Sequence, residues 1–251
     1  MIITSRDNQT IKEIIKLKDK KFRENSYLVE GIKQVREAIK ENAKIEKIVI
    51  SEDFENKDEF ENFECIEVST RIFRDMTDTK SPQGILAVVA KNKNKEIDYS
   101  KDFLIILDNI QDPGNLGTII RTADSCDLGQ VIVSTDTVDS YSPKVIRSTM
   151  GSSFRINVIE RNLVETIKEI KENGFEIVVT SLQTDKSIYD LDYSKKAIVI
   201  GNEANGVRHE IMKEADLAVK IPMLGKTESL NASIAAGVMM YEYSRQKITK
   251  M

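Results

Sequence analysis

The chain has 251 residues, of which 40% are apolar and 31% charged, and its net charge is -4. This length and apolar content suit one large or two small globular domains, and the negative charge argues against a protein that coats nucleic acid indiscriminately, although it allows a local basic surface. No run approaches the roughly 20 apolar residues of a membrane span, and the N-terminus lacks the pattern of a signal peptide, so we expect a cytoplasmic protein that is not held in a membrane.

The first 23 residues carry seven Lys or Arg against three acids. Their apolar residues have the spacing of one helix face, with lysines largely around it, which predicts a basic amphipathic helix over residues 11–23. A solvated surface helix and a phosphate-contacting face fit this pattern equally well. The apolar positions are Ile11, Ile14, Ile15 and Leu17.

Alternating strands and helices follow. The segments YLVEG, IEKIVIS, ECIEVS and GILAVVA are predicted strands, and GIKQVREAIKEN is a predicted helix. They predict a small α/β domain at residues 1–92. The polar stretch KNKNKEIDYSK has no apolar periodicity, so we expect a linker at residues 93–101 and a second domain at residues 102–251.

The second domain opens with the segment that anchors its interpretation, FLIILDNIQDPGNLGTIIRTADSCDLG at residues 103–129. A buried strand is predicted first, then a turn rich in Gly and Asn, then a short helix with Asn115 as its N-cap and Gly129 just past its end. This order exposes backbone N–H groups at the carboxyl end of a strand, where α/β proteins usually bind ligands.

The rest of the second domain repeats this alternation. The segments QVIVS, FEIVVTSL, AIVI and LAVKIPM are predicted strands, SPKVIRSTMGSSFRINVIE a helical piece and a strand, and LVETIKEIKENG a helix ending at Gly174. A final helix is predicted in GKTESLNASIAAGVMMYEYSRQ, and its small, apolar body predicts burial nearly all round. Three strands run into loops rich in Gly, Asn, Ser and Glu, which indicates one pocket built from several strand ends.

Several kinds of site are disfavoured. Neither glycine loop matches a dinucleotide or ATP fingerprint, and His209 has no partner set that forms a metal site, so a surface or helix-end histidine is favoured and no metal is expected. Cys65 and Cys126 are expected to be buried thiols without a role.

Polar residues remain at the loop ends. Arg121 lies on the helix after the glycine turn, and an ion-paired surface arginine is the interpretation that the sequence alone favours. The candidates are Asn115, Arg121, Glu203, Ser229 and Asn231.

Three segments carry a family resemblance. NIQDPGNLGTIIRTAD, IVIGNEANGV and IPMLGKTESLNASIAAG resemble, in order and spacing, the motifs of the SpoU/TrmH-type RNA ribose methyltransferases of the SPOUT superfamily, and RSTMGSSFR is also similar to that family. The similarity extends from about residue 100 to the C-terminus. Upstream, YLVEGIKQVREAI and SPQGILAVV resemble the L30e/L7Ae-like RNA-binding domain that precedes many members.

The resemblance implies a fold, a cofactor and a reaction. We expect an α/β catalytic domain with a mostly parallel sheet and a C-terminal trefoil knot, S-adenosylmethionine (AdoMet) as cofactor, a homodimer, and 2′-O-methylation of RNA ribose. The RNA-reading domain favours 23S rRNA over tRNA; a tRNA ribose methyltransferase and a catalytically silent RNA-binding relative are the alternatives. By position, the implied cofactor-binding residues are Thr180, Gly201, Ile221 and Leu230.

Arg121 matches the family's catalytic arginine, with Asn115, Glu203, Ser229 and Asn231 around it. The family proposal makes this arginine the base. Because a guanidinium has a pKa above about 12, we favour a role in which Arg121 grips a phosphate and stabilises the developing alkoxide, while Ser229 and Asn231 orient the ribose.

Overall fold

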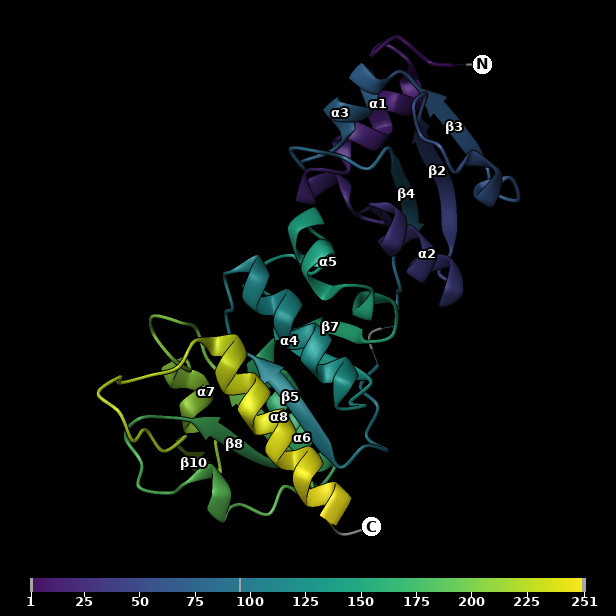
Figure 1. Cartoon of the computed structure of the whole chain (residues 1–251). Helices are drawn as coiled ribbons and strands as arrows, with labels where there is room; N and C mark the ends of the chain where they lie inside the picture. Colours follow the sequence, from purple (N-terminus) through teal and green to yellow (C-terminus); the bar gives the residue numbers. More distant parts are fainter. Residues whose placement is uncertain (1, 95, 250–251) are drawn as a thin grey trace. The chain divides into compact units, whose positions relative to one another are not determined.

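The computed structural model describes residues 2–94 and 96–249. Its chain forms two compact units (Figure 1). Unit 1 comprises Met1–Lys93 and Asp139–Phe154, and unit 2 comprises Asn94–Val138 and Arg155–Met251. Residues 139–154, from the middle of the expected second domain, therefore pack with unit 1, while Lys95 of the expected linker lies outside the described residues. The functional division into an RNA-binding domain and a methyltransferase domain stays a prediction.

Unit 1 is built on a four-stranded mixed sheet in the order β1-β4-β2-β3. Strand β4 runs antiparallel to β1 and β2, whereas β3 is parallel to β2. Apolar side chains of α1 and α3 pack on one face of this sheet, and those of α2 and α5 pack on the other. The elements are α1 Gln9–Lys16, η1 Lys20–Phe22, β1 Ser26–Glu30, α2 Ile32–Lys40, β2 Ile45–Ser51, η2 Lys57–Phe60, β3 Cys65–Val68, α3 Thr70–Met76, β4 Ile85–Ala90, α5 Pro143–Thr149 and η3 Ser152–Phe154.

The four predicted strands of unit 1 are present, but its first helix is shorter than predicted. Helix α1 ends at Lys16, and the chain then turns through the 3-10 helix η1 instead of continuing to residue 23. Lysines after residue 16 extended the basic pattern, but the apolar face stops at Leu17, so nothing holds a longer helix on the sheet. Helix α3 was not predicted, because its seven residues are too few for a clear periodicity.

Unit 2 is built on a six-stranded sheet in the order β10-β8-β9-β5-β6-β7. Every strand pair in it is parallel, so the predicted mostly parallel sheet is confirmed. Helices α6 and α7 pack on one face, and α4 and α8 pack on the other. The elements are β5 Phe103–Leu107, α4 Pro113–Ser125, β6 Gln130–Ser134, β7 Asn157–Arg161, α6 Leu163–Glu172, β8 Glu176–Thr180, η4 Ile188–Asp190, β9 Lys196–Ile200, α7 His209–Lys213, β10 Leu217–Val219 and α8 Ala232–Thr249.

One prediction about the helices of unit 2 is wrong, and another is left open. Asp112, not Asn115, is the N-cap of α4: its carboxylate accepts a hydrogen bond from the Asn115 backbone N–H at 2.9 Å, and Pro113 takes the first helical position. The core of one chain does not bury helix α8 all round, because Ile234 is 53% exposed and Tyr241 is 57% exposed, so burial of this face at a dimer interface stays a prediction. Within the described part of the chain, every helix is too short or too polar to cross a membrane.

Candidate active site

Three of the predicted site residues meet in unit 2 through their side chains. The Asn115 Nδ2 donates to Glu203 Oε1 at 2.7 Å, and the Asn231 Nδ2 donates to Asn115 Oδ1 at 3.0 Å. Asn115 lies in the first turn of α4, Glu203 in the loop after β9, and Asn231 immediately before α8. Because all strands of this sheet are parallel, segments that follow different strands reach the same edge.

Helix capping explains why these amides point where they do. Asp112 caps α4, so the Asn115 side chain is not needed as a cap and can bridge the other two residues. The Asn231 Oδ1 accepts from the backbone N–H of Ser233 at 2.9 Å and from its hydroxyl at 2.6 Å. Asn231 thus uses its acceptor to cap α8 and its donor to hold α4.

Arg121 lies on α4 with an exposed side chain. It forms no hydrogen bond or ion pair with any of the described residues, so the ion pair that the sequence alone favours is absent there. A guanidinium without a protein partner keeps five N–H donors in a planar fork for a ligand, and this geometry fits a phosphate or a carboxylate.

Gly201 directly follows β9, and the chain turns back over it at once. Asn202 and Gly206 exchange two backbone hydrogen bonds of 2.9 Å, and a Cβ on Gly201 would lie 2.1 Å from the carbonyl carbon of Gly206. Only glycine fits under this closed loop, which carries Glu203 on its exposed side. The glycine therefore sets the position of Glu203 through the backbone.

The other predicted site residues are spread over two segments. The Thr180 hydroxyl at the end of β8 donates to the carbonyl of Val199 at 3.2 Å, so it is used within the sheet. Ile221 is partly buried, and Leu230 is 36% exposed in the loop between β10 and α8. In the same loop Ser229 is exposed, and its hydroxyl has no hydrogen-bond partner among the described residues.

The ion pair of Asp108 and Arg208, which was not predicted from the sequence, joins two loops at this edge of the sheet. Asp108 directly follows β5 and is fully buried, and its carboxylate accepts from the Arg208 backbone N–H at 2.8 Å and from Nε at 2.7 Å. The hydrogen bond to Asp108 raises the pKa of Arg208, as do the nearby charges of Asp108, Glu210 and Asp136, while burial opposes the rise. An acid directly after an apolar strand could have drawn attention to Asp108, but no local pattern connects it with an arginine 100 positions later.

Metal-ligating and thiol side chains add nothing to this group. Within residues 2–94 and 96–249, no three His, Cys, Asp or Glu side chains are arranged to hold a metal ion. His209 is exposed at the start of α7, the helix-end position that the sequence favours. Neither cysteine forms a disulfide; Cys126 is buried, but Cys65 is exposed on β3, contrary to the prediction, because β3 is an edge strand.

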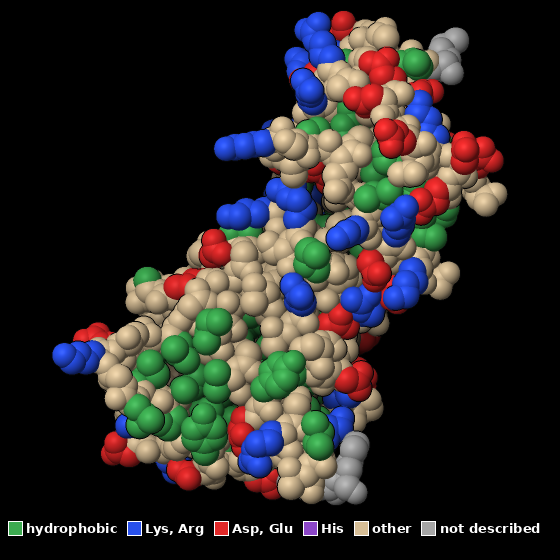
Figure 2. All heavy atoms as spheres, viewed as in Figure 1, with side chains coloured by type: hydrophobic (Ala, Val, Ile, Leu, Met, Phe, Trp, Pro, Cys, Tyr) green, Lys and Arg blue, Asp and Glu red, His purple; other side chains and the backbone are tan. Residues whose placement is uncertain are grey.

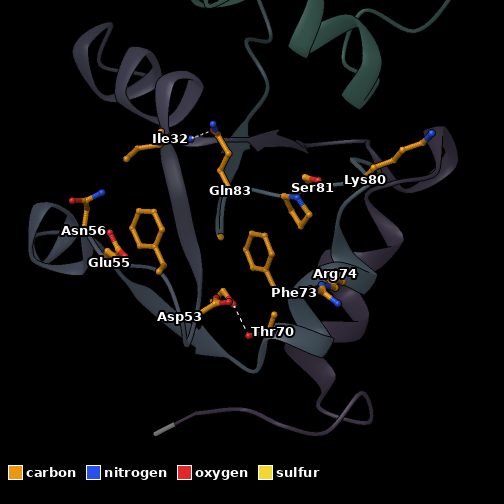
Figure 3. A pocket seen from close by; sticks show the side chains of 14 residues that line it. Ile32, Asp53, Glu55, Asn56, Thr70, Phe73, Arg74, Lys80, Ser81 and Gln83 are labelled. Atoms are coloured by element: carbon orange, nitrogen blue, oxygen red, sulfur yellow. Dashed lines mark hydrogen bonds between the residues drawn. The ribbon is translucent and has the colours of Figure 1, made fainter.

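Unit 1 has a pocket of its own, of about 510 Å³ (Figure 3). Asp53, Phe73 and Gln83 line it from the end of β2, from α3 and from the loop before β4. The Gln83 side-chain oxygen accepts from the Ile32 backbone N–H at 3.1 Å, and hydrogen bonding from Ser51 lowers the pKa of Asp53. None of the predicted site residues lines this pocket.

Comparison with known proteins identifies the family. Residues 102–241, more than half of the chain, match the SpoU rRNA Methylase family, and residues 8–87 match the MRM3-like substrate binding domain. The chain belongs to the SpoU rRNA methylase family. The SpoU/TrmH resemblance read from the motifs is thereby confirmed; the knot stays a prediction.

SpoU relatives align with nearly the whole chain. The 23S rRNA (guanosine(2553)-2'-O)-methyltransferase RlmP of Bacillus subtilis is 35% identical over 95% of this chain and 97% of that protein. The crystal structure of an AdoMet-bound rRNA methyltransferase from Sinorhizobium meliloti has a TM-score of 0.88 and 30% identity, and 98% of each chain is covered. An RNA 2'-O ribose methyltransferase structure has a TM-score of 0.83 and 29% identity, covering 99% of this chain and 100% of that one.

Proposed function

We propose that this protein transfers the methyl group of AdoMet to a ribose 2′-hydroxyl of 23S rRNA. The observation that carries the proposal is the hydrogen-bonded group of Asn115, Glu203 and Asn231. Its member Asn115 lies on α4, the helix that also carries Arg121, which is exposed and has no ion-pair partner among the described residues. The similarity to RlmP along both units supports 23S rRNA over tRNA and makes a guanosine the first candidate nucleotide. Such a substrate goes with the cytoplasmic location expected from the sequence.

The loops at the carboxyl edge of the sheet fit AdoMet. When bound, AdoMet supplies an electrophilic methyl carbon on its sulfonium. Leu224 is fully exposed and Leu230 is 36% exposed in the loop after β10, and apolar side chains left open at a strand end suit an adenine ring. We assign the binding of AdoMet to the backbone around Gly201 and to Ile221 and Leu230, with Thr180 acting through its backbone because its hydroxyl is used in the sheet.

Arg121 is the residue that we assign to the RNA at the reacting centre. Its guanidinium grips the phosphate beside the target ribose and so places the 2′-oxygen in line with the methyl carbon, at about 3 Å. The same positive charge stabilises the oxygen as its proton leaves. The C–S bond breaks as the O–C bond forms, and the products are a 2′-O-methyl ribose, S-adenosylhomocysteine and a proton.

The surrounding residues hold this arrangement. Asn231 acts as a positioning residue, because both ends of its amide are bonded within the protein. Asn115 connects it to Glu203, and Ser229, whose hydroxyl is exposed, is the group that we assign to the ribose. From the sequence we expected both Ser229 and Asn231 to orient the ribose. We now assign that contact to Ser229 alone, with Asn231 holding the site in place.

We further propose that the protein works as a homodimer formed through α8. Ile234, Tyr241 and Ile248 are exposed at intervals of seven residues on this helix, and Figure 2 shows hydrophobic side chains gathered on the face of unit 2 that carries it. A second copy of the chain covers this stripe by two-fold symmetry. Ile234→Asp with Tyr241→Asp should give a monomer by light scattering, whereas Leu182→Asp, at another exposed leucine, should leave the dimer intact.

The function is tested by incubating the purified protein with methyl-labelled AdoMet and, separately, unmodified 23S rRNA, 16S rRNA and bulk tRNA, followed by nucleoside analysis. We expect label in a 2′-O-methylnucleoside from 23S rRNA only. Label on tRNA would replace the proposed substrate, and no transfer to any RNA would favour the silent RNA-binding relative.

A further inference from the structure

The lysines at the start of unit 1 are of two kinds. Lys12 forms an ion pair with Asp7 at 2.8 Å, and Lys18 forms one with Asp78 at 2.6 Å, so both charges are compensated within the protein. The remaining lysines of this stretch are exposed and form no ion pair with any described residue. They are Lys16, Lys20 and Lys21.

Phe22 lies among these uncompensated lysines and is 40% exposed at the end of η1. The Lys16 Nζ lies 5.5 Å from the centre of its ring, and the Lys21 Nζ lies 4.9 Å from it. The other described aromatics of unit 1 are buried or half-buried; Tyr27, for example, is 4% exposed, and Tyr141 packs against it. We call Lys16, Lys20, Lys21 and Phe22 the basic aromatic patch.

The turn that presents Phe22 is held by the next residue. Arg23 is 4% exposed, and its NH1 donates to the carbonyl oxygens of Leu17 at 2.7 Å and Lys18 at 2.5 Å. Its Nε and NH2 donate to the Asp139 carboxylate at 2.8 and 2.7 Å. A buried guanidinium with four such bonds fixes the backbone on both sides of η1, so Phe22 projects from an ordered turn.

The charge around the patch favours an anionic partner. Three acids, Glu13, Asp19 and Glu24, lie in the same stretch, and none of them forms an ion pair with the three lysines. Figure 2 shows Lys and Arg side chains gathered along the edge of unit 1 that carries α1 and α3. The negative net charge of the chain is therefore not spread evenly over its surface.

We propose that the basic aromatic patch binds a single-stranded segment of the RNA substrate, with an unstacked base on the Phe22 ring and the flanking phosphates at Lys16, Lys20 and Lys21. This proposal rests on the proposed function. Single-stranded RNA alternates flat apolar bases with phosphates, which matches a ring surrounded by mobile cations. An RNA duplex or an acidic peptide would engage the lysines and leave the ring without a partner.

Phe22→Ala tests the stacking contact. The full chain is titrated with single-stranded oligo(U) and with an RNA duplex of the same length, without AdoMet, and melting temperatures check that each variant is folded. Because stacking on an aromatic ring is lost, we expect about tenfold weaker binding of oligo(U). Phe22→Tyr should restore it, and binding of the duplex should not change.

Lys20→Gln with Lys21→Gln tests the charges. Each lost phosphate contact on a single strand lowers the slope of log K against log salt concentration by about 0.7, so we expect a change of about 1.4 for the double variant. Lys12→Gln is the matched control, because it removes a nearby lysine, on α1, that is already ion-paired with Asp7, and it should change neither the slope nor the affinity by a comparable amount.

The two proposals fail in different ways. If the wild-type protein methylates 23S rRNA while Phe22→Ala binds oligo(U) and 23S rRNA as tightly as the Lys12→Gln control, the patch is not an RNA site, although the proposed function stands. If Phe22→Ala weakens oligo(U) and duplex equally, the stacked base is excluded. If the wild-type protein transfers no methyl group but Phe22→Ala still loses oligo(U) binding, the patch is supported and the proposed function is overturned.

Discussion

Arg208 donates from its backbone and its side chain to the same buried carboxylate, that of Asp108. Asp108 has no exposed surface, whereas the Arg208 side chain is 34% exposed and also reaches Asp136 at 2.9 Å. The Asp108 carboxylate, directly after β5, thus fixes the beginning of α7 and the loop before it through Arg208. Because that loop carries Glu203, the ion pair fixes one member of the proposed site without touching the reactants.

Arg208→Ala should destabilise the protein. In this variant the buried Asp108 carboxylate keeps the hydrogen bond from the backbone N–H of residue 208 but loses the bond and the charge of the guanidinium. We expect a loss of about 2 kcal/mol in unfolding free energy, less than the roughly 3–5 kcal/mol of a fully buried pair because Arg208 is partly exposed. Urea unfolding measures this. Glu210→Gln removes one of the two exposed partners of Arg208, at 3.3 Å, and serves as the control, so equal losses in both variants would contradict the role given to Asp108.

Gly201→Ala should disrupt the loop that carries Glu203. The added Cβ would lie 2.1 Å from the carbonyl carbon of Gly206, so the backbone must move, at a cost of about 1–3 kcal/mol or more. We expect calorimetric titration to show loss of AdoMet binding together with a lower melting temperature. Gly237→Ala, on α8, is the control, because a Cβ at Gly237 would only touch the Thr122 side chain at 3.9 Å, an ordinary contact. Unchanged AdoMet binding in Gly201→Ala would exclude Gly201 from the cofactor site.

Asn115→Asp should impair methyl transfer more than Asn115→Ala does. The Asn115 Nδ2 donates to Glu203 Oε1 at 2.7 Å, and a carboxylate there would replace a hydrogen bond by the repulsion of two like charges. Deleting the side chain leaves both neighbours able to bond to water. We expect about tenfold lower transfer for Asn115→Ala, from the loss of about 1.4 kcal/mol of positioning, and a larger loss for Asn115→Asp. The reverse order in single-turnover rates would mean that Asn115 does not hold Glu203.

Glu242 should make stability depend on pH. Hydrogen bonds from Arg245 chiefly, and also from Gln246, lower the pKa of this carboxyl in the folded state against the opposing effect of burial. A lowered folded-state pKa stabilises the protein fully above the unfolded value of about 4.3, and the stabilisation is lost as the pH falls through the folded value. Glu242→Gln should therefore cost about 0.5–1 kcal/mol at neutral pH, since Arg245 is mostly exposed, and less at about pH 3.5.

Urea unfolding at both pH values measures this difference. Glu172→Gln, on the exposed side of α6, is the control and should change the unfolding free energy only slightly at either pH. A Glu242→Gln penalty that grows as the pH falls would have the wrong sign for a lowered pKa.

Apolar patterns and family motifs predicted most of the fold. Strands such as FLIIL and AIVI could be predicted because a buried parallel strand is apolar nearly throughout. The meeting of Asn115, Glu203 and Asn231 could be expected only from the motifs of the family, because no local pattern joins side chains 88 and 116 positions apart.

Features that depend on long-range packing could not be predicted from the sequence. The Asp108 and Arg208 ion pair joins two loops, the exposed stripe of α8 is set by what the sheet leaves uncovered, and the end of α1 is set by where its apolar face stops. Local propensity carries none of this information.

The role of Arg121 in methyl transfer is tested by comparing the wild-type protein, Arg121→Lys and Arg245→Lys. Each is incubated with labelled AdoMet and unmodified 23S rRNA, and the transfer of label is measured. We expect a 2′-O-methylnucleoside from the wild-type protein and from Arg245→Lys. For Arg121→Lys we expect AdoMet binding to stay intact and the rate of methyl transfer to fall at least about a hundredfold, because lysine offers a point charge in place of a planar fork. Near-normal transfer by Arg121→Lys would contradict the role of Arg121, and the absence of any 2′-O-methylnucleoside with the wild-type protein would contradict the function itself.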